Sequence, residues 1–232
     1  MSTLFVTATG TDIGKTYVTA LLVRTLREKG FPVRALKPVI SGFDPEASKT
    51  SDSAILLEAM GENVSEETLA AISPWRYAAP LAPNMAARLE DRMVDFNAIV
   101  SWSKVQSGPV IIEGVGGIMS PISDDKTGLD WMVGLASPAL LIGGSYLGAL
   151  SHTLSAVAAM RARGIRIAGI VVNESEAGSI GLEETAEALK PFVAGLPLVM
   201  LSRGLGDGPA AKQIRLDQVA DLHAVALQCL AD

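Results

Sequence analysis

The chain has 232 residues, of which 49% are hydrophobic and 19% charged, so its length and composition predict a single globular domain and exclude a disordered chain. Its formal net charge of −6 excludes a general nucleic-acid binder, which needs a basic face. The one cysteine, Cys229, excludes an internal disulfide framework and favours a reducing cytoplasm.

Strand-like and helix-like segments alternate along the chain. Short apolar runs predict strands, and apolar residues at helical spacing predict helices. In chain order we expect strand Leu4–Thr9, helix Lys15–Lys29, strand Val33–Val39, helix Ser53–Met60, a helix within Glu66–Ile72, a helix after Pro83, helix Val94–Gln106, a strand from Pro109 (PVIIEG), strand Ala139–Ile142, helix Leu150–Arg163, strand Ile167–Val172, helix Gly181–Leu189, strand Leu196–Leu201 and helix Leu216–Leu230.

This alternation predicts an α/β fold with a mostly parallel sheet and helices on both faces. The most apolar run, Ser137–Leu150, is short and interrupted by glycines, so it predicts a buried strand and turn rather than a membrane span. The chain opens on a predicted strand without a secretory signal, and we expect a cytoplasmic protein with no membrane or nucleic-acid partner. Without internal repeats or a low-complexity linker, residues 1–232 are expected to form one domain, whose ligands bind at the carboxyl ends of the strands.

The loop after the first predicted strand reads TATGTDIGKT and resembles a phosphate-binding loop. Gly14, Lys15 and Thr16 supply a flexible turn, a cation for the β- and γ-phosphates and a hydroxyl for Mg²⁺, at the start of a helix whose amides attract anions. Thr9 stands where the strict motif has glycine, and Gly10 provides a second flexible point. A P-loop NTPase-like fold is therefore expected; the alternative is an ordinary strand–helix turn with an exposed lysine.

Charged residues follow two other predicted strands. Glu113 ends a buried strand, where a carboxylate needs a partner such as a metal ion, although a lysine partner or a helix cap is the alternative. Lys37 and Ser41 follow the second strand, and Asp52 lies near a helix start. Taken alone, Lys37 could equally be a solvated surface lysine instead of a site residue, and Asp52 could be only the N-cap of a helix. Together with the phosphate loop they predict a magnesium–nucleotide site.

The histidines and the cysteine give no alternative catalytic centre. His223 lies on an amphipathic helix and is expected to be structural, whereas His152 near a strand end is a weaker candidate. No His/Cys cluster has zinc spacing, and neither a Gly-x-Ser-x-Gly motif nor a catalytic cysteine pattern occurs.

Several motifs occur in the same order as in a known family. They are TDIGKT, KPVISG, the SD of Asp52, APLAPNMAA, EGVGG, SPISD, GSYLGALSH and the VVN ending at Asn173. On these motifs, which span most of the chain, it resembles the dethiobiotin synthetases. The occurrence of both the Lys-Pro-Val and the Glu-Gly-x-Gly-Gly motifs in one chain is more specific to this family than a phosphate loop alone.

The resemblance implies a reaction and a set of site residues. The reaction is an ATP- and Mg²⁺-dependent ring-closing carboxylation of 7,8-diaminononanoate with CO₂, through a carbamate and a carbamic-phosphoric anhydride, giving dethiobiotin, ADP and phosphate. It assigns catalysis to Lys37, Lys15 and Thr11, a substrate contact to Ser41, and Mg²⁺ binding to Thr16, Asp52 and Glu113. It assigns ATP binding to Asp12, Ile13, Gly14, Lys15, Thr16, Tyr17, Asp52, Glu113, Gly114, Val115, Gly116 and Asn173.

The resemblance also implies a homodimer with the Gly144–His152 loop near the subunit interface. The chain departs from the family at Ser151, where asparagine is frequent, at Asn84, where histidine is common, and at Ser202–Gly204, where Ile-Pro often lies near adenine.

Three rival functions share parts of this pattern. A partition or division-site ATPase switch would carry a lysine at the position of Gly10, and a basic tail in place of the acidic residues of the last helix. An amidoligase acting on a cobalamin precursor would be longer and carry a glutaminase domain. A nucleotide-binding regulator would turn over ATP slowly and ignore the diamine.

Overall fold

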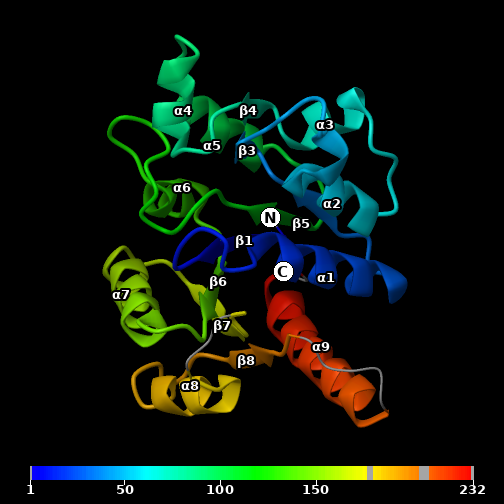
Figure 1. Cartoon of the computed structure of the whole chain (residues 1–232), viewed down its shortest axis with the longest axis vertical. Coiled ribbons are helices and arrows are strands. Elements are labelled where there is room, and N and C mark those ends of the chain that lie inside the picture. The colour runs from blue at the N-terminus through cyan, green and yellow to red at the C-terminus, as the bar shows by residue number, and fades with distance from the viewer. Residues whose placement is uncertain (1, 177–179, 204–208, 231–232) are drawn as a thin grey trace.

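The computed structural model describes residues 2–176, 180–203 and 209–230 (Figure 1). Its strands are β1 (Thr3–Ala8), β2 (Arg34–Leu36), β3 (Val39–Ser41), β4 (Trp75–Tyr77), β5 (Val110–Glu113), β6 (Ala139–Gly144), β7 (Ile167–Asn173) and β8 (Leu198–Leu201). Its helices are α1 (Lys15–Glu28), the 3₁₀ helix η1 (Ser48–Thr50), α2 (Asp52–Ala59), α3 (Glu66–Ile72), α4 (Pro83–Leu89), α5 (Phe96–Lys104), α6 (Gly128–Leu135), α7 (Ala149–Ala162), α8 (Leu182–Leu189) and α9 (Pro209–Leu230).

The main sheet is parallel throughout. Within the described residues its six strands lie in the order β2-β5-β1-β6-β7-β8. Strands β5 and β6 are buried along their whole length, as their continuous apolar sequence predicts. Helices α7 and α8 pack on one side of β6–β8, and α1 and α9 pack together on the other (Figure 1). The predicted α/β fold with a mostly parallel sheet is confirmed.

The expected single strand Val33–Val39 is wrong. The chain leaves the main sheet after Leu36, and Val39 begins a separate two-stranded sheet of β3 and β4. Pro38 has no N–H to donate to a sheet ladder, and the Lys37 N–H donates instead to the Ile72 carbonyl at 3.1 Å. This break places Lys37 at the carboxyl edge of the main sheet.

The sequence patterns missed helix α6 and strand β4, and they placed the start of the last helix too late. Helix α6 buries Leu129, Trp131 and Met132, so its apolar residues show little periodicity. Strand β4 has three residues, too few to give a clear alternation. Helix α9 begins at Pro209 instead of Leu216, with proline in the first turn, where it is tolerated.

Two further features concern membrane spanning and the packing of the core. Among the described residues, no helix combines the length and the apolar character that crossing a membrane requires. The core around the sheet includes Phe5 of β1 edge-to-face with Trp131 of α6, with ring centroids 5.1 Å apart. This packing supports the central strand whose carboxyl end leads into the phosphate loop.

Candidate functional site

The loop between β1 and α1 has the backbone of a phosphate-binding loop. Asp12 and Gly14 have positive φ angles of 57° and 96°, and Gly14 is the N-cap of α1 without a side-chain cap. The first amides of α1 are therefore left to bind an anion, which the helix dipole also favours. A Cβ on Gly14 would lie 2.2 Å from Nδ2 of Asn173, so only glycine fits this turn. The missing glycine at Thr9 does not prevent the loop from forming.

Lys15 is the cation of this loop. Its side chain is buried, and Nζ donates to the carbonyl oxygen of Gly10 at 3.0 Å, across the mouth of the loop. Burial, together with the nearby Lys37 ammonium, lowers the pKa of Lys15 to about 8. Lys15 is thus mostly charged near neutral pH.

Three residues from separate elements meet around Lys37. Its Nζ lies 2.7 Å from Oδ2 of Asp52 and 2.5 Å from Oε1 of Glu113. Oε1 of Glu113 also accepts a hydrogen bond from the Thr16 hydroxyl at 2.7 Å. Lys37 directly follows β2 and Glu113 ends β5, as expected for the carboxyl ends of parallel strands, and Thr16 and Asp52 lie in the first turns of α1 and α2.

The geometry tests the structural interpretations that the sequence left open for Lys37, Asp52 and Glu113. Lys37 is only 3% exposed, so it is not a solvated surface lysine. The N-cap of α2 is Ser51, whose side chain accepts from the Ala54 N–H, so Asp52 is not the cap. Glu113 is fully buried and has the lysine partner that was its alternative reading.

The cluster is charged. Burial alone would lower the pKa of Lys37, but the Glu113 and Asp52 carboxylates outweigh it and raise that pKa above its ordinary value. Burial would likewise raise the pKa of Asp52, but the Lys37 ammonium holds it below its ordinary value. Lys37 is therefore an ammonium ion and Asp52 a carboxylate at neutral pH.

The same residues fit a magnesium ion. Oε2 of Glu113 is buried and has no hydrogen-bond partner among the described residues, so it is free to act as a ligand. Asp52 and Thr16 add a carboxylate and a hydroxyl, which are oxygen donors that Mg²⁺ prefers. In the part of the chain that the structure describes, no group of three or more His, Cys, Asp or Glu side chains could hold a metal. Phosphate oxygens and water would have to complete the coordination of Mg²⁺, as is usual for nucleotide-bound magnesium.

Two cavities meet at the phosphate loop. The larger, about 790 Å³, is lined by Thr11, Lys15, Lys37 and Ser41 and bounded by the proline-rich segment 80–83. The hydroxyl oxygen of Ser41 is buried there without a hydrogen-bond partner among the described residues. This cavity therefore contains the Ser41 hydroxyl together with Lys15 and Lys37.

The second cavity, about 670 Å³, lies beyond the loop and is lined by Ile13, Asn173 and Ser202 among others. The two cavities share Asp12, Gly14 and Tyr17. This arrangement suits a ligand that places its phosphates at the loop and the rest of itself in one cavity, with a second substrate in the other cavity.

The remaining residues of the expected site divide into two groups. Val115 and Gly116 line the larger cavity, and Gly116 has a positive φ of 63°. Gly114 lines neither cavity; a Cβ there would lie 2.9 Å from the Phe5 ring, so this glycine is needed for packing. Gly204 of the Ser202–Gly204 segment lies outside the described residues.

Ser120 is a cavity residue that the sequence reasoning did not single out. It lines the larger cavity, and its hydroxyl accepts from the Gly117 N–H at 2.8 Å. The SPISD motif contains Ser120 and was the available signal. Of the histidines, His223 is buried between Thr25 and Lys29, whereas exposed His152 contacts the Tyr146 hydroxyl.

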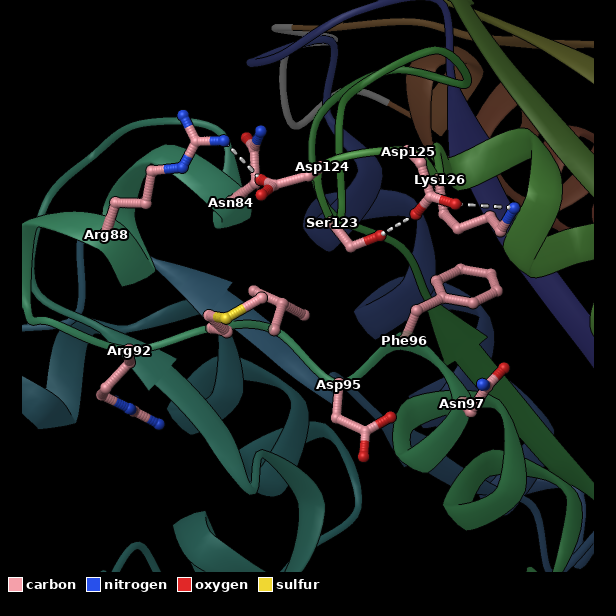
Figure 2. A pocket seen from close by; sticks show the side chains of 12 residues that line it. Asn84, Arg88, Arg92, Asp95, Phe96, Asn97, Ser123, Asp124, Asp125 and Lys126 are labelled. Carbon is pink, nitrogen blue, oxygen red and sulfur yellow. Dashed lines mark hydrogen bonds and ion pairs between the residues drawn. The ribbon is translucent and has the colours of Figure 1, made fainter.

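A further cavity of about 300 Å³ lies between α4, the start of α5 and the 123–126 loop (Figure 2). Its charged groups largely neutralise one another, because Arg88 pairs with Asp124 at 2.7 Å and Lys126 with Asp125 at 3.0 Å. Asn84 reaches this cavity from α4. The pairing leaves little free positive charge for a phosphate, in contrast to the loop at α1.

Comparisons with known proteins give sequence relatives over most of the chain. A family model described as an AAA domain matches residues 2–198. ATP-dependent dethiobiotin synthetase from Caulobacter sp. (strain K31) is 46% identical over 88% of this chain and 89% of its own length. The enzyme of the same name from Methylobacterium nodulans is 47% identical over 89% of this chain and 95% of its own.

The similarity to solved structures concerns the fold alone. The MinC:MinD cell division protein complex of Aquifex aeolicus is similar with a TM-score of 0.52 at 12% identity, over 99% of this chain and 96% of that one. The signal recognition particle receptor FtsY of Elizabethkingia anophelis has a TM-score of 0.51 at 13% identity, over 95% of this chain and 65% of that one.

Proposed function

The chain belongs to the family of ATP-dependent dethiobiotin synthetases, and from that membership we propose that it carboxylates 7,8-diaminononanoate with CO₂ and closes the ureido ring of dethiobiotin. The observation that carries this proposal is the position of Lys15 and Lys37. Both line the cavity that contains Ser41, and Lys15 also belongs to the phosphate loop. A phosphoryl group at the loop would therefore lie next to a substrate held beside Ser41.

Carbamate formation is the first step. One amine of the diamine attacks the carbon of CO₂, a C–N bond forms as one C=O π pair moves onto oxygen to give the carbamate anion, and the nitrogen passes its proton to water. Only the neutral amine has the electron pair for this attack, and nearby ammonium groups disfavour its protonated form. Lys15 and Lys37 supply those charges and attract the carbamate that results.

Phosphoryl transfer is the second step. A carbamate oxygen attacks the γ-phosphorus of ATP, and the bond from that phosphorus to the ADP oxygen breaks. Negative charge on the transferred group is stabilised by Lys15 and by the first amides of α1, which have no side-chain cap. Thr11, at the wall of the same cavity, would contact the carbamate and phosphate. When bound by Thr16, Asp52 and Glu113, Mg²⁺ would neutralise phosphate charge.

Ring closure is the last step. The second amine attacks the carbonyl carbon of the carbamic-phosphoric anhydride, and the carbon–oxygen bond to the phosphate breaks. Phosphate leaves with that oxygen, and the attacking nitrogen loses a proton. Ser41, whose buried hydroxyl has no partner among the described residues, would orient the diamine for this attack.

The proposal also covers the assembly and its location. The Gly144–His152 loop presents Leu147 with 82% of its surface exposed, which suits contact with a second copy of the chain. The single cysteine suits a reducing cytoplasm. We propose a cytoplasmic homodimer in which this loop lies near the substrate.

Product analysis tests the function. Purified protein with ATP, Mg²⁺, bicarbonate and the diamine should form dethiobiotin and ADP in equal amounts, whereas omitting the diamine should stop ADP release. Lys37→Met should form no dethiobiotin while still binding ATP, and Lys49→Met, which changes an exposed lysine, should match the wild type. ADP release that ignores the diamine would contradict the proposal and favour a nucleotide-dependent switch.

A further inference from the structure

The end of β4 is tied to the residues that follow α4. The Ala78 N–H, one residue beyond β4, donates to Oε1 of Glu90 at 2.8 Å. Oε2 of Glu90 accepts from Nη1 of Arg92 at 2.8 Å, and the same Nη1 donates to the Arg76 carbonyl oxygen at 3.2 Å. The guanidinium of Arg92 also lies over the Tyr77 ring, 4.7 Å from its centroid. Glu90 and Arg92 together form a clamp on β4 and the residue after it, which we call the β4 clamp.

The backbone at the end of α4 directs the clamp to β4. Asp91 has a positive φ of 52°, and the Arg92 N–H turns back to donate to the Ala87 carbonyl oxygen at 2.9 Å. Aspartate is among the residues that adopt this left-handed conformation most readily. Arg88, four residues before Arg92, points instead to Asp124 and away from Arg92 (Figure 2). The β4 clamp is therefore separate from the Arg88 ion pair.

The clamp lies next to residues that line the larger cavity at the phosphate loop. Ser41 pairs with Tyr77 across β3 and β4, and β4 is the one strand paired with β3 among the described residues. From Ala78 the chain runs into segment 80–83, whose four residues all line that cavity. A shift of the end of β4 would therefore move Ser41 and segment 80–83 together.

The clamp opposes such a local shift more than it stabilises the whole fold. The Glu90 and Arg92 side chains are 28% and 46% exposed, and ion pairs this exposed add little to the free energy of unfolding. The hydrogen bond from the Ala78 N–H keeps the pKa of Glu90 below its ordinary value, so a charged oxygen accepts this bond at neutral pH. Charge-assisted bonds of this kind are among the stronger ones, and this one must break before the end of β4 can open locally.

Under the proposed function, on which this inference rests, the larger cavity receives the diamine beside Ser41. Neither Glu90 nor Arg92 lines that cavity. We propose that both are positioning residues, which hold Ser41 and segment 80–83 through β4 in the arrangement that binds the diamine. The phosphate loop follows β1 of the main sheet, whereas β3 and β4 form a separate sheet. Loss of the clamp should therefore weaken diamine binding and leave ATP binding unchanged.

Two variants each remove one half of the clamp. Arg92→Met keeps an apolar side chain near Tyr77 but cannot pair with Glu90. Glu90→Ala leaves the Ala78 N–H without its acceptor. Arg92→Lys is the conservative variant, because its ammonium group can still pair with Glu90 and lie over the Tyr77 ring. A role that needs only the cation predicts rescue by lysine.

Arg163→Met is the matched control. Arg163 pairs with Asp130 at 2.8 Å, the same distance as in the clamp, and 45% of its side chain is exposed, against 46% for Arg92. Arg163 does not line the larger cavity. The control therefore removes an equally exposed ion pair, and its melting temperature should match those of the clamp variants.

Calorimetric titration with 7,8-diaminononanoate, without ATP or bicarbonate, and a separate titration with ATP and Mg²⁺ measure the two affinities. Arg92→Met and Glu90→Ala should bind the diamine about tenfold more weakly and ATP as the wild type does. Arg92→Lys and Arg163→Met should bind both as the wild type does. The double variant Glu90→Ala/Arg92→Met should lose no more than either single variant, because both residues act through one clamp.

Other results would contradict this role. Clamp variants that bind the diamine like the wild type, or that weaken diamine and ATP binding equally, would overturn the inference and leave the proposed function standing. Clamp variants that do not fold where Arg163→Met folds would also overturn it, because the clamp would then support the whole fold. Wild-type protein that binds ATP but not the diamine would overturn the proposed function, and this inference with it.

Discussion

Replacing Lys37 with methionine should destabilise the protein strongly. Lys37 is the ammonium partner of Glu113, which is fully buried, and of Asp52, whose side chain is 42% exposed. Without Lys37, Asp52 keeps much of its hydration, but Glu113 becomes a buried charge without a counter-ion. Removing one member of a buried ion pair costs about 3–5 kcal/mol of unfolding free energy. For a chain of this size, that loss lowers the melting temperature by about 6–20 °C.

Urea unfolding and calorimetry would measure this loss. The double variant Lys37→Met/Glu113→Gln is the control, because a neutral amide removes the charge that the single variant leaves unpaired. The double variant should be more stable than Lys37→Met alone. A loss below about 1 kcal/mol in the single variant, or a double variant less stable than the single one, would refute the role given to this ion pair.

The remaining predictions concern the loop, a buried histidine and the metal ligands. Gly14→Ala should weaken ATP binding about 10- to 100-fold in titrations, because its Cβ would meet Asn173 Nδ2 at 2.2 Å, whereas Gly30→Ala, with open space around it, should not. Burial lowers the pKa of His223 from 6.5, so the unfolded chain takes up this proton first as the pH falls. The stability from the neutral ring is thus complete above pH 6.5 and is lost below it; urea unfolding at about pH 7.5 and 5.5 should show this loss, and His223→Gln should reduce it. Asp52→Asn should raise the Mg²⁺ concentration for half-maximal turnover at least about tenfold, and an unchanged Mg²⁺ titration would exclude it as a ligand.

The sequence was informative where a single physical requirement dominated. Continuous apolar runs predicted the central strands β5 and β6, because strands covered on both faces have no need of polar residues. Lys37 and Glu113 could be expected to meet because parallel strands end at one edge of the sheet, whereas Asp52, near a predicted helix start, was joined to them only through the phosphate-loop interpretation.

Local patterns failed where contacts distant in sequence decide the structure. The stretch Val33–Val39 was predicted as one strand, but Pro38 and the hydrogen bond from the Lys37 N–H to the Ile72 carbonyl separate β2, which ends at Leu36, from β3, which begins at Val39 in another sheet. The hydrogen bonds that join Ser202, which follows β8, to Gln218 of α9 depend on how that helix packs beside the strand, and neither residue belongs to a recognisable motif.

The central claim is that this site couples phosphoryl transfer to closure of the ureido ring, and isotope transfer from bicarbonate tests it most directly. The protein would be given ¹³C,¹⁸O-bicarbonate, ATP, Mg²⁺ and 7,8-diaminononanoate in unlabelled water, and the reaction would be quenched before the oxygen label exchanges. The account predicts ¹³C and ¹⁸O in the ureido carbonyl of dethiobiotin, and ¹⁸O in the released phosphate. Dethiobiotin formed together with unlabelled phosphate would contradict it, because water and not the carbamate would then have attacked ATP.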